Sequence, residues 1–265
     1  MKAALMTHRG AVRGENQDAV FVSGIVRTSD MDVPEFCDLD PMSHPILLAV
    51  IDGMGGHEGG ALAARIVGET LAEKADKNDL FGARTDIDED EQTLRQLLAE
   101  AVRRMKTEAL ANSLLSEMGA AMSGVLLREQ SALAFNCGDC RVYRFSDGCL
   151  ERVTRDHSIV QVLFEREEIT EEEMRRHPRK NVITSSISAV SGNEFELYVR
   201  ELPLREGDSF LLCSDGVWEA LPSRKLTELL AQDIPLLDAA CALFDALLAA
   251  NCRDNVSFIL WRVGR

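Results

Sequence analysis

The order in which predicted strands and helices follow one another constrains the fold of this 265-residue chain more than any other feature. Short β-branched or alternating runs predict strands, and many are only a few residues apart, as at Asp147-Gly148, a dipeptide that predicts a hairpin. The predicted strands are Ala3–Thr7, Ala19–Val26, Pro45–Ile51, Met122–Leu127, Ser131–Asn136, Arg141–Phe145, Leu150–Val153, Glu196–Leu202, Ser209–Cys213 and Val256–Val263. Apolar residues at helical spacing predict helices over Gly60–Lys74, Gln92–Leu115, Lys225–Ala231 and Leu236–Ala250.

The predicted helices come in pairs between blocks of hairpin-linked strands and do not alternate with strands one for one. This order favours an α+β fold of mainly antiparallel sheets covered by helices over a doubly wound parallel sheet. The length would also allow two small domains, but the chain has only 7 prolines and no Pro/Gly/Ser-rich linker. We therefore expect one domain over residues 1–265, with surface loops at Arg27–His44 and Asp76–Glu91.

Composition and net charge indicate which classes of partner the chain does not bind and in which cell compartment it is expected. A formal net charge of −15 argues against binding to nucleic acid or to an anionic membrane. The N-terminus lacks the apolar stretch of a signal peptide, and no segment approaches the roughly 20 apolar residues that span a bilayer. Together with an odd number of cysteines, 7, this predicts reduced thiols and a cytoplasmic protein. Cys137 and Cys140 have redox or zinc spacing, but no second pair accompanies them, so we expect no such function.

Aspartates stand at the ends of several predicted strands. The apolar run Ile46–Ile51 leads directly to Asp52, and glycines follow from Gly53 onward. Phe210–Ser214 leads to Asp215 in the same way. Three more aspartates lie at strand edges, namely Asp18, Asp139 and Asp254. A carboxylate at the end of a buried strand has a fixed position. Because no set of histidines and cysteines accompanies these carboxylates, they predict Mg²⁺ or Mn²⁺ and not zinc.

Six motifs in order carry a resemblance to a known family. They read R-G-E-N-Q-D, D-G-M-G-G-H, G-D-C-R-V-Y, T-R-D-H-S, C-S-D-G-V and R-D-N-V-S. From about residue 7 to residue 262 the chain resembles the PPM (type 2C) metal-dependent protein phosphatases, most closely their bacterial single-domain branch. The resemblance implies a four-layer α-β-β-α sandwich, with two antiparallel sheets flanked by helix pairs and a metal site at one end. It also implies hydrolysis of phosphoserine and phosphothreonine on proteins.

The resemblance assigns metal-binding roles by position. Asp52 would bridge two Mn²⁺ or Mg²⁺ ions, and the Gly53 carbonyl would bind one of them. Asp215 and Asp254 would complete the ligands of the other ion, and Asp139 with Asp215 would hold a weaker third ion. Asp18 matches a carboxylate that acts through metal-bound water. Two cations lower the pKa of the water between them, so that the resulting hydroxide attacks phosphorus without an enzyme nucleophile.

Other catalytic roles follow from the same motifs. Arg13 matches the arginine that binds the substrate phosphate, which a guanidinium can grip with two hydrogen bonds. The leaving alkoxide needs a proton, which His57 or a metal-bound water could supply, although hydrogen bonding near the metal is the simpler role for His57. Asp156 or Ser158 is expected to cap a helix that begins near Ile159. The segment 165–180 resembles the mobile flap beside the bacterial catalytic cleft.

Two segments depart from the family pattern. Gly119-Ala120-Ala121 stands where G-T-T is usual, and Thr184–Ala189 replaces a run of the form R-A-[LI]-G. Neither change removes a metal ligand, so the departures bear on specificity more than on catalysis. We expect a monomer that acts on phosphorylated proteins and opposes a Ser/Thr kinase. Two alternatives remain open: a catalytically weak regulatory member that binds phosphoproteins, and a phosphoesterase for small molecules.

Overall fold

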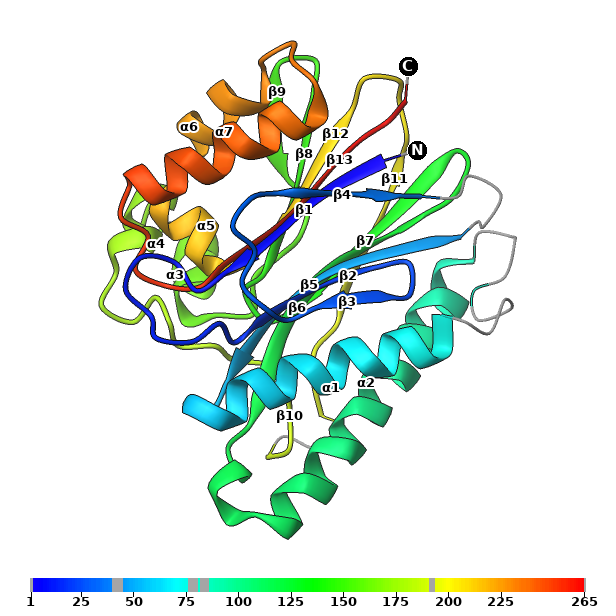
Figure 1. The fold of residues 1–265 in the computed structure, drawn as a ribbon, viewed down its shortest axis with the longest axis vertical. Helices are drawn as coiled ribbons and strands as arrows, with labels where there is room; N and C mark the ends of the chain where they lie inside the picture. Colours follow the sequence, from blue (N-terminus) through cyan, green and yellow to red (C-terminus); the bar gives the residue numbers. More distant parts are fainter. Residues whose placement is uncertain (1, 40–44, 76–80, 82–85, 191–193, 265) are drawn as a thin grey trace.

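The computed structural model describes residues 2–39, 45–75, 81, 86–190 and 194–264, apart from the side chains of His57 and Ala75. Two antiparallel sheets lie face to face (Figure 1). The strand order in the first sheet is β4 (Glu35–Asp38), β1 (Lys2–His8), β13 (Val256–Arg262), β12 (Ser209–Cys213), β8 (Arg141–Ser146) and β9 (Cys149–Arg152). In the second it is β11 (Tyr198–Pro203), β7 (Ser131–Cys137), β6 (Gly119–Leu127), β5 (Ile46–Met54), β2 (Asp18–Val22) and β3 (Ile25–Arg27), and β10 (Ile187–Ser188) pairs with β6.

Helices cover the outer faces of both sheets (Figure 1). The second sheet is covered by α1 (His57–Ala75) and α2 (Ile87–Ala111), and a 3₁₀ helix, η1 (Ser113–Leu115), follows α2. The first sheet is covered by α5 (Asp215–Ala220), α6 (Ser223–Leu230) and α7 (Leu236–Ala249). Two short helices, α3 (Ile159–Glu165) and α4 (Glu171–Arg176), lie between β9 and β10 in the chain. The predicted four-layer α-β-β-α architecture is confirmed.

The continuous apolar run of β5 follows from burial on both of its faces. Leu48 and Val50 belong to the core cluster between the two sheets, which extends to α6 and α7. Leu47, Ala49 and Ile51 belong to a second cluster, between the second sheet and helices α1 and α2. Because both faces of β5 are enclosed, the end of this strand has little freedom to move, and Asp52 lies at that end.

Several element boundaries differ from the prediction. The strand predicted over Ala19–Val26 is two strands, because Ser23 and Gly24 adopt φ angles of 44° and 91° and turn the chain. The segment predicted as a loop over Arg27–His44 contains the edge strand β4, and its residues 40–44 lie outside the described ranges. The second predicted helix starts earlier, at Ile87, because Asp86 accepts the N–H groups of two first-turn residues.

Other features follow the prediction closely. Asp147 and Gly148 both have positive φ angles, 51° and 79°, and they connect β8 to β9 as a tight hairpin. Ser158 caps α3 by accepting the N–H of Gln161 at 3.3 Å, so of the two proposed caps the serine is the right one. Most of the predicted loop over 76–91 lies outside the described residues. Of the helices within the described ranges, none has the length and apolar content needed to cross a lipid bilayer.

The two segments that depart from the family pattern lie against each other. Ser188 pairs with Gly119 and Ile187 with Ala120 across the β10–β6 ladder. A Cβ atom on Gly119 would stand only 2.8 Å from the Cβ of Ser188, which is closer than two carbon atoms can pack. The glycine is therefore required for this close pairing, and the two departures form one structural unit.

Candidate functional site

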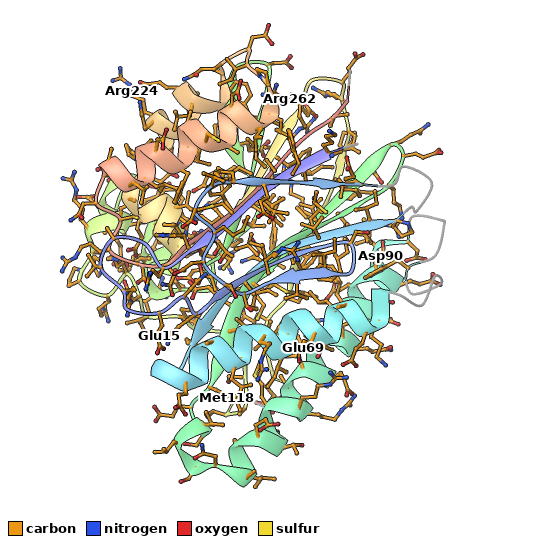
Figure 2. The ribbon with its side chains drawn as sticks, viewed as in Figure 1. Glu15, Glu69, Asp90, Met118, Arg224 and Arg262 are labelled. Atoms are coloured by element: carbon orange, nitrogen blue, oxygen red, sulfur yellow. The ribbon has the colours of Figure 1, made fainter. Side chains whose placement is uncertain are left out.

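A cleft of about 690 Å³ opens at one end of the sandwich. The predicted metal and phosphate ligands that line it are Arg13, Asp52, Gly53, Asp139, Asp215 and Asp254. Glu15, from the loop before β2, lies at the end of the molecule where α1 begins, whereas Arg262 lies at the other end of the first sheet (Figure 2). The cleft gathers residues from Arg13 to Asn255, which are far apart in the chain.

Both sheets contribute carboxylates to the cleft. Asp52 lies near the end of β5 in the second sheet, and Asp139 lies in the loop that leads from β7 to β8. Asp215 is the first residue of α5, directly after β12, and Asp254 precedes β13 in the first sheet. Since each acid follows or precedes a strand of the core, four of the five predicted aspartates reach one cavity from fixed positions.

Asp18 lies beneath this cleft and is not among the described residues that line it. It is 2% exposed, and it stands opposite Asp52 in the β2–β5 ladder. Its Oδ2 accepts the hydroxyl of Ser214 at 2.9 Å, while its Oδ1 has no hydrogen-bond partner among the described residues. A buried carboxylate oxygen without a partner is costly, and a cation or its water would satisfy it.

The carboxylates strongly perturb one another. Burial raises the pKa of Asp52 and Asp215 well above their ordinary values, and the neighbouring aspartates raise both further. Burial likewise raises the pKa of Asp18 and of Asp139 to about 7. As these acids lose their protons, their negative charges repel one another, and bound divalent cations would offset that repulsion. The donor set therefore fits hard, oxygen-seeking cations.

An ion at this cleft would need ligands besides the acidic side chains. Within the described ranges, no three His, Cys, Asp or Glu side chains are close enough to hold one ion unaided. Mg²⁺ is commonly bound by one or two carboxylates and several waters, so a looser set of ligands is what such a site requires. A main-chain oxygen such as that of Gly53 would then be a natural addition.

Gly53 is held by a close approach of three backbone segments. Its N–H donates to the carbonyl of Gln17 at 3.1 Å. A Cβ atom at this position would lie 2.0 Å from the carbonyl oxygen of Gly60 and 2.5 Å from that of Gln17. Only glycine fits, which explains why the residue after Asp52 has no side chain.

Arg13 lies at the cleft beside the carboxylate of Asp254. Its Nη2 donates to Asp254 Oδ2 at 2.6 Å, and half of the arginine side chain remains exposed. The hydrogen bond to Asp254 and the charges of Asp254, Asp215 and Asp52 raise the pKa of Arg13. The guanidinium is thus a permanent positive charge at the mouth of an acidic cavity.

Asn255, in the R-D-N-V-S motif, anchors the loop before β2. Its Oδ1 accepts the N–H of Gln17 at 2.9 Å, and its Nδ2 donates to the carbonyls of Arg9 and Glu15 at 3.2 and 2.8 Å. These bonds fix the loop that carries Arg13. The position next to Asp254 was the only clue that the sequence offered.

The segment predicted as a flap lies beside the cleft and is tied to α5. Arg175 donates to the carbonyls of Trp218 and Glu219 at 3.1 and 2.8 Å, and Lys180 pairs with the Glu219 side chain. Directly after the segment, residues 181–183 line the cleft. Sequence reasoning missed α5 and the role of Glu219, because a six-residue helix is too short to show periodicity.

Two predictions about other residues have different outcomes. All 7 cysteines are free thiols, and burial raises the pKa of both Cys137 and Cys140. The side chain of His57, the predicted acid, lies outside the described part of the structure. Its backbone begins α1.

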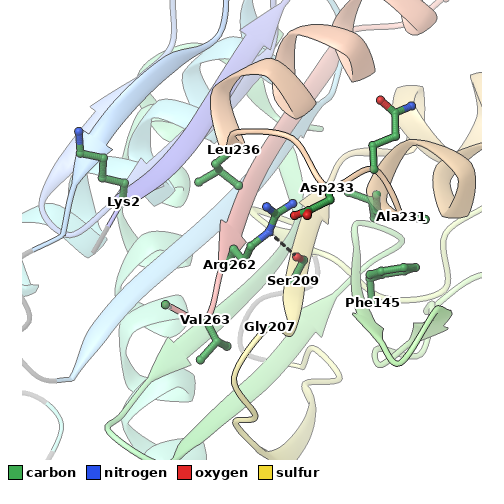
Figure 3. Close-up of a pocket in the computed structure, with 12 residues that line it drawn as sticks. Lys2, Phe145, Gly207, Ser209, Ala231, Asp233, Leu236, Arg262 and Val263 are labelled. Atoms are coloured by element: carbon green, nitrogen blue, oxygen red, sulfur yellow. Dashed lines mark hydrogen bonds between the residues drawn. The ribbon is translucent and has the colours of Figure 1, made fainter.

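A second cavity, of about 500 Å³, lies at the other end of the first sheet (Figure 3). There Arg262 donates to Ser209 Oγ at 3.2 Å and to the carbonyl of Ile234 at 3.1 Å. Among the described residues that line it, Asp233 is the only acid. A centre built from several carboxylates therefore belongs to the first cavity.

A family model described as protein phosphatase 2C matches residues 36–252 of this chain. The chain belongs to the protein phosphatase 2C family. The serine/threonine phosphatase stp of Listeria monocytogenes is 27% identical over 260 residues, which cover 98% of this chain and 95% of that protein. The crystal structure of the serine/threonine phosphatase Stp1 from Staphylococcus aureus is 26% identical, has a TM-score of 0.82 and covers 99% of this chain and 95% of that one.

A further solved structure similar to this one contains metal. The catalytic domain of the serine/threonine phosphatase PstP in complex with two manganese ions is 26% identical, with a TM-score of 0.77 and complete coverage, 100%, of both chains. Together these similarities confirm the family, the fold class and the enzyme class expected from the motifs, a protein serine/threonine phosphatase.

Proposed function

We propose that this chain hydrolyses phosphoserine and phosphothreonine on proteins at the cleft between its sheets. Two Mn²⁺ or Mg²⁺ ions would be held by Asp52, the Gly53 carbonyl, Asp215 and Asp254. The observation that carries the proposal is the convergence of these acids and Arg13 on one cavity, from both sheets. The manganese in the similar PstP structure supports the choice of cation.

When bound, two such cations supply a hydroxide at neutral pH and stabilise the charge that develops on the phosphoryl oxygens. The protein's part is to place the substrate. Arg13 binds the phosphate, because its guanidinium is charged, exposed at the cleft and oriented by Asp254.

Two residues complete the proposed catalytic set. Asp18 accepts hydrogen bonds from water at the centre through its unpartnered Oδ1, while Ser214 keeps its other oxygen in place. His57 is assigned a hydrogen-bonding role near the ions and is the candidate donor of the proton that the leaving serine or threonine oxygen needs. Asp139, with Asp215, is assigned to a third and weaker ion.

The test is phosphate release from a phosphothreonine peptide by the purified chain. With Mn²⁺ we expect turnover, which chelator abolishes and which Asp52→Asn lacks. Asp233→Asn, an acid of the second cavity, is the matched control and should retain full activity. Absence of turnover with any divalent cation would sink the proposal and leave the regulatory, phosphoprotein-binding alternative.

A second comparison addresses the substrate class. The same preparation is assayed on phosphopeptides, a chromogenic aryl phosphate and nucleotides. We expect the highest kcat/KM on phosphopeptides, and a strong preference for a small metabolite would favour the alternative of a small-molecule phosphoesterase.

The biological setting forms a further part of the proposal. We infer that the chain acts as a single-domain monomer in the cytoplasm, opposite a Ser/Thr kinase, and its free cysteines support a reducing compartment. Phosphoproteins that accumulate when its gene is deleted, and that lose phosphate when the purified chain is added, would identify its substrates. Size-exclusion chromatography tests the monomeric state, and cell fractionation tests the cytoplasmic location.

A further inference from the structure

Trp218 connects two parts of the candidate metal centre that come from different elements. It lies in α5, three residues after Asp215, and it is 2% exposed. Its indole Nε1 donates to the main-chain carbonyl of Asp139 at 3.1 Å. A single side chain therefore ties the helix that begins with Asp215 to the loop that carries Asp139.

The indole is itself fixed by a buried ion pair. The guanidinium carbon of Arg141 lies 3.7 Å from the centroid of the Trp218 ring. Arg141 donates to Asp156 through Nε and Nη2, and its Nη1 donates to the Tyr143 hydroxyl at 3.0 Å. The side chains of Arg141 and Asp156 are only 2% and 0% exposed. A guanidinium with these partners cannot leave the ring, so the indole keeps its orientation.

The residue before Asp139 is held from another direction. The N–H of Gly138 donates to His157 Nδ1 at 3.1 Å, and the carbonyl of Gly138 accepts the N–H of His157 at 2.8 Å. Gly138 has a φ of 100°, and a Cβ there would lie 2.4 Å from that of Ala121. Asp139 is thus fixed on both sides, by His157 through Gly138 and by Trp218 through its own carbonyl.

We propose that Trp218 is a positioning residue, which sets the separation of the Asp139 and Asp215 carboxylates and thereby the affinity for the most weakly bound divalent cation. The inference rests on the proposed function, since it concerns the same metal centre. Asp52, Gly53 and Asp254 belong to β5 and to the loop before β13, outside the contact between Trp218 and Asp139. The two ions assigned to those ligands share only Asp215 with this contact. Asp215 directly follows β12, so its position also depends on that strand, and these two ions depend on Trp218 much less.

The chain offers a matched pair of variants, because it contains two tryptophans. Trp218→Phe keeps an aromatic ring against Arg141 and removes the N–H that Asp139 accepts. Trp261→Phe is the control: Trp261 is 1% exposed in β13, and its indole nitrogen has no hydrogen-bond partner among the described residues. The control variant also leaves Trp218 as the only tryptophan, so that its fluorescence can be followed alone.

Mn²⁺ binding is measured by calorimetry and by electron paramagnetic resonance of the free ion, without substrate. We expect Trp218→Phe to weaken the lowest-affinity site about 3- to 10-fold, as the loss of one hydrogen bond implies, and to leave the tighter sites unchanged. Trp261→Phe should match the wild type at every site. In Trp261→Phe, paramagnetic Mn²⁺ should quench Trp218 emission as the weakest site fills.

Three outcomes would overturn the inference. The first is that Trp218→Phe binds Mn²⁺ with unchanged affinities, and the second is that the wild type has no Mn²⁺ site beyond two tight ones. The third is that saturation of Trp261→Phe with Mn²⁺ leaves the emission of Trp218 unaltered. If Trp218→Phe does not fold, as circular dichroism would reveal, the fluorescence titration of Trp261→Phe decides. A wild type that binds no Mn²⁺ at all would refute the metal centre of the proposed function, which the other outcomes leave standing.

Discussion

Asp18 and Asp52 stand directly opposite each other on the antiparallel strands β2 and β5. Burial raises the pKa of both, and the charge of Asp18 raises that of Asp52 further. Ser214, directly after β12 of the other sheet, accepts the N–H of Ser257 at 3.0 Å, and its hydroxyl donates a hydrogen bond to Asp18 at 2.9 Å. Through Ser214, Asp18 thus connects the second sheet to the first beside the candidate site.

Replacing Asp215 should remove most activity without unfolding the protein. Asp215→Asn keeps the shape of a residue at the start of α5 but removes the charge that two ions would share. We expect kcat/KM on a phosphothreonine peptide to fall at least about 100-fold, beyond the usual effect of changing an outer-shell partner. Circular dichroism should show an unchanged fold. Activity within a few-fold of the wild type would contradict the ligand assignment.

Asp139 is predicted to matter only when metal is scarce. Asp139→Ala should keep the two tightly bound ions and shift the Mn²⁺ concentration for half-maximal activity upward. The physical reason is that a weaker ion loses one of its carboxylates. Activity is followed across a Mn²⁺ titration, with Asp233→Ala as the matched acid outside the cleft. Superimposable curves for Asp139→Ala and wild type would exclude a third ion at this position.

Arg13 is predicted to act through the geometry of its guanidinium and not only through its charge. Arg13→Lys keeps the charge but cannot bind phosphate with two parallel hydrogen bonds, so we expect KM for the phosphopeptide to rise about 10-fold. The control is Arg253→Lys, an exposed arginine next to Asp254 that is not among the described residues lining the cleft. An equal change in both variants would argue against a specific phosphate contact.

The metal-free protein should lose stability as pH rises. The folded-state pKa of Asp215 lies well above its ordinary value, because of burial and neighbouring acids. The folded state therefore binds protons more tightly than the unfolded one, and stability is lost as pH rises from about 4 through that raised pKa. In chelator, Asp215→Asn should melt at a higher temperature than wild type at pH 8, and the difference should vanish near pH 4. A difference independent of pH would contradict this.

The buried pair Arg141–Asp156 should be essential for stability. Asp156→Asn leaves the Arg141 charge without its counter-charge in a site where both side chains are nearly inaccessible. We expect a loss of about 3–5 kcal/mol in chemical denaturation. Glu165→Gln removes the partner of Arg155 in an exposed pair and should cost less than about 1 kcal/mol. Similar losses for both would show that burial does not control the effect.

The positions of the candidate aspartates could be predicted from the sequence because each stands at or next to the end of a strand of the core. Asp52 is an example: an apolar run that ends in a charge can only be a buried strand that delivers an acid to an edge. Trp218 and Glu219 could not be found in this way, since their partners Asp139 and Lys180 are distant in the chain and join them only after folding. The break between β2 and β3 was missed because Ser23 takes up a positive φ that serine rarely adopts.

The contact between Gly119 and Ser188 limits how this enzyme can be altered. A Cβ introduced at position 119 would collide with Ser188, which pairs with it across the β10–β6 ladder. The family run G-T-T keeps this glycine, so exchanging residues 119–121 alone changes Ala120 and Ala121, of which Ala120 pairs with Ile187 in the other departing segment. A chimaera designed to transfer substrate preference should therefore carry both segments together, because each forms part of the other's surroundings.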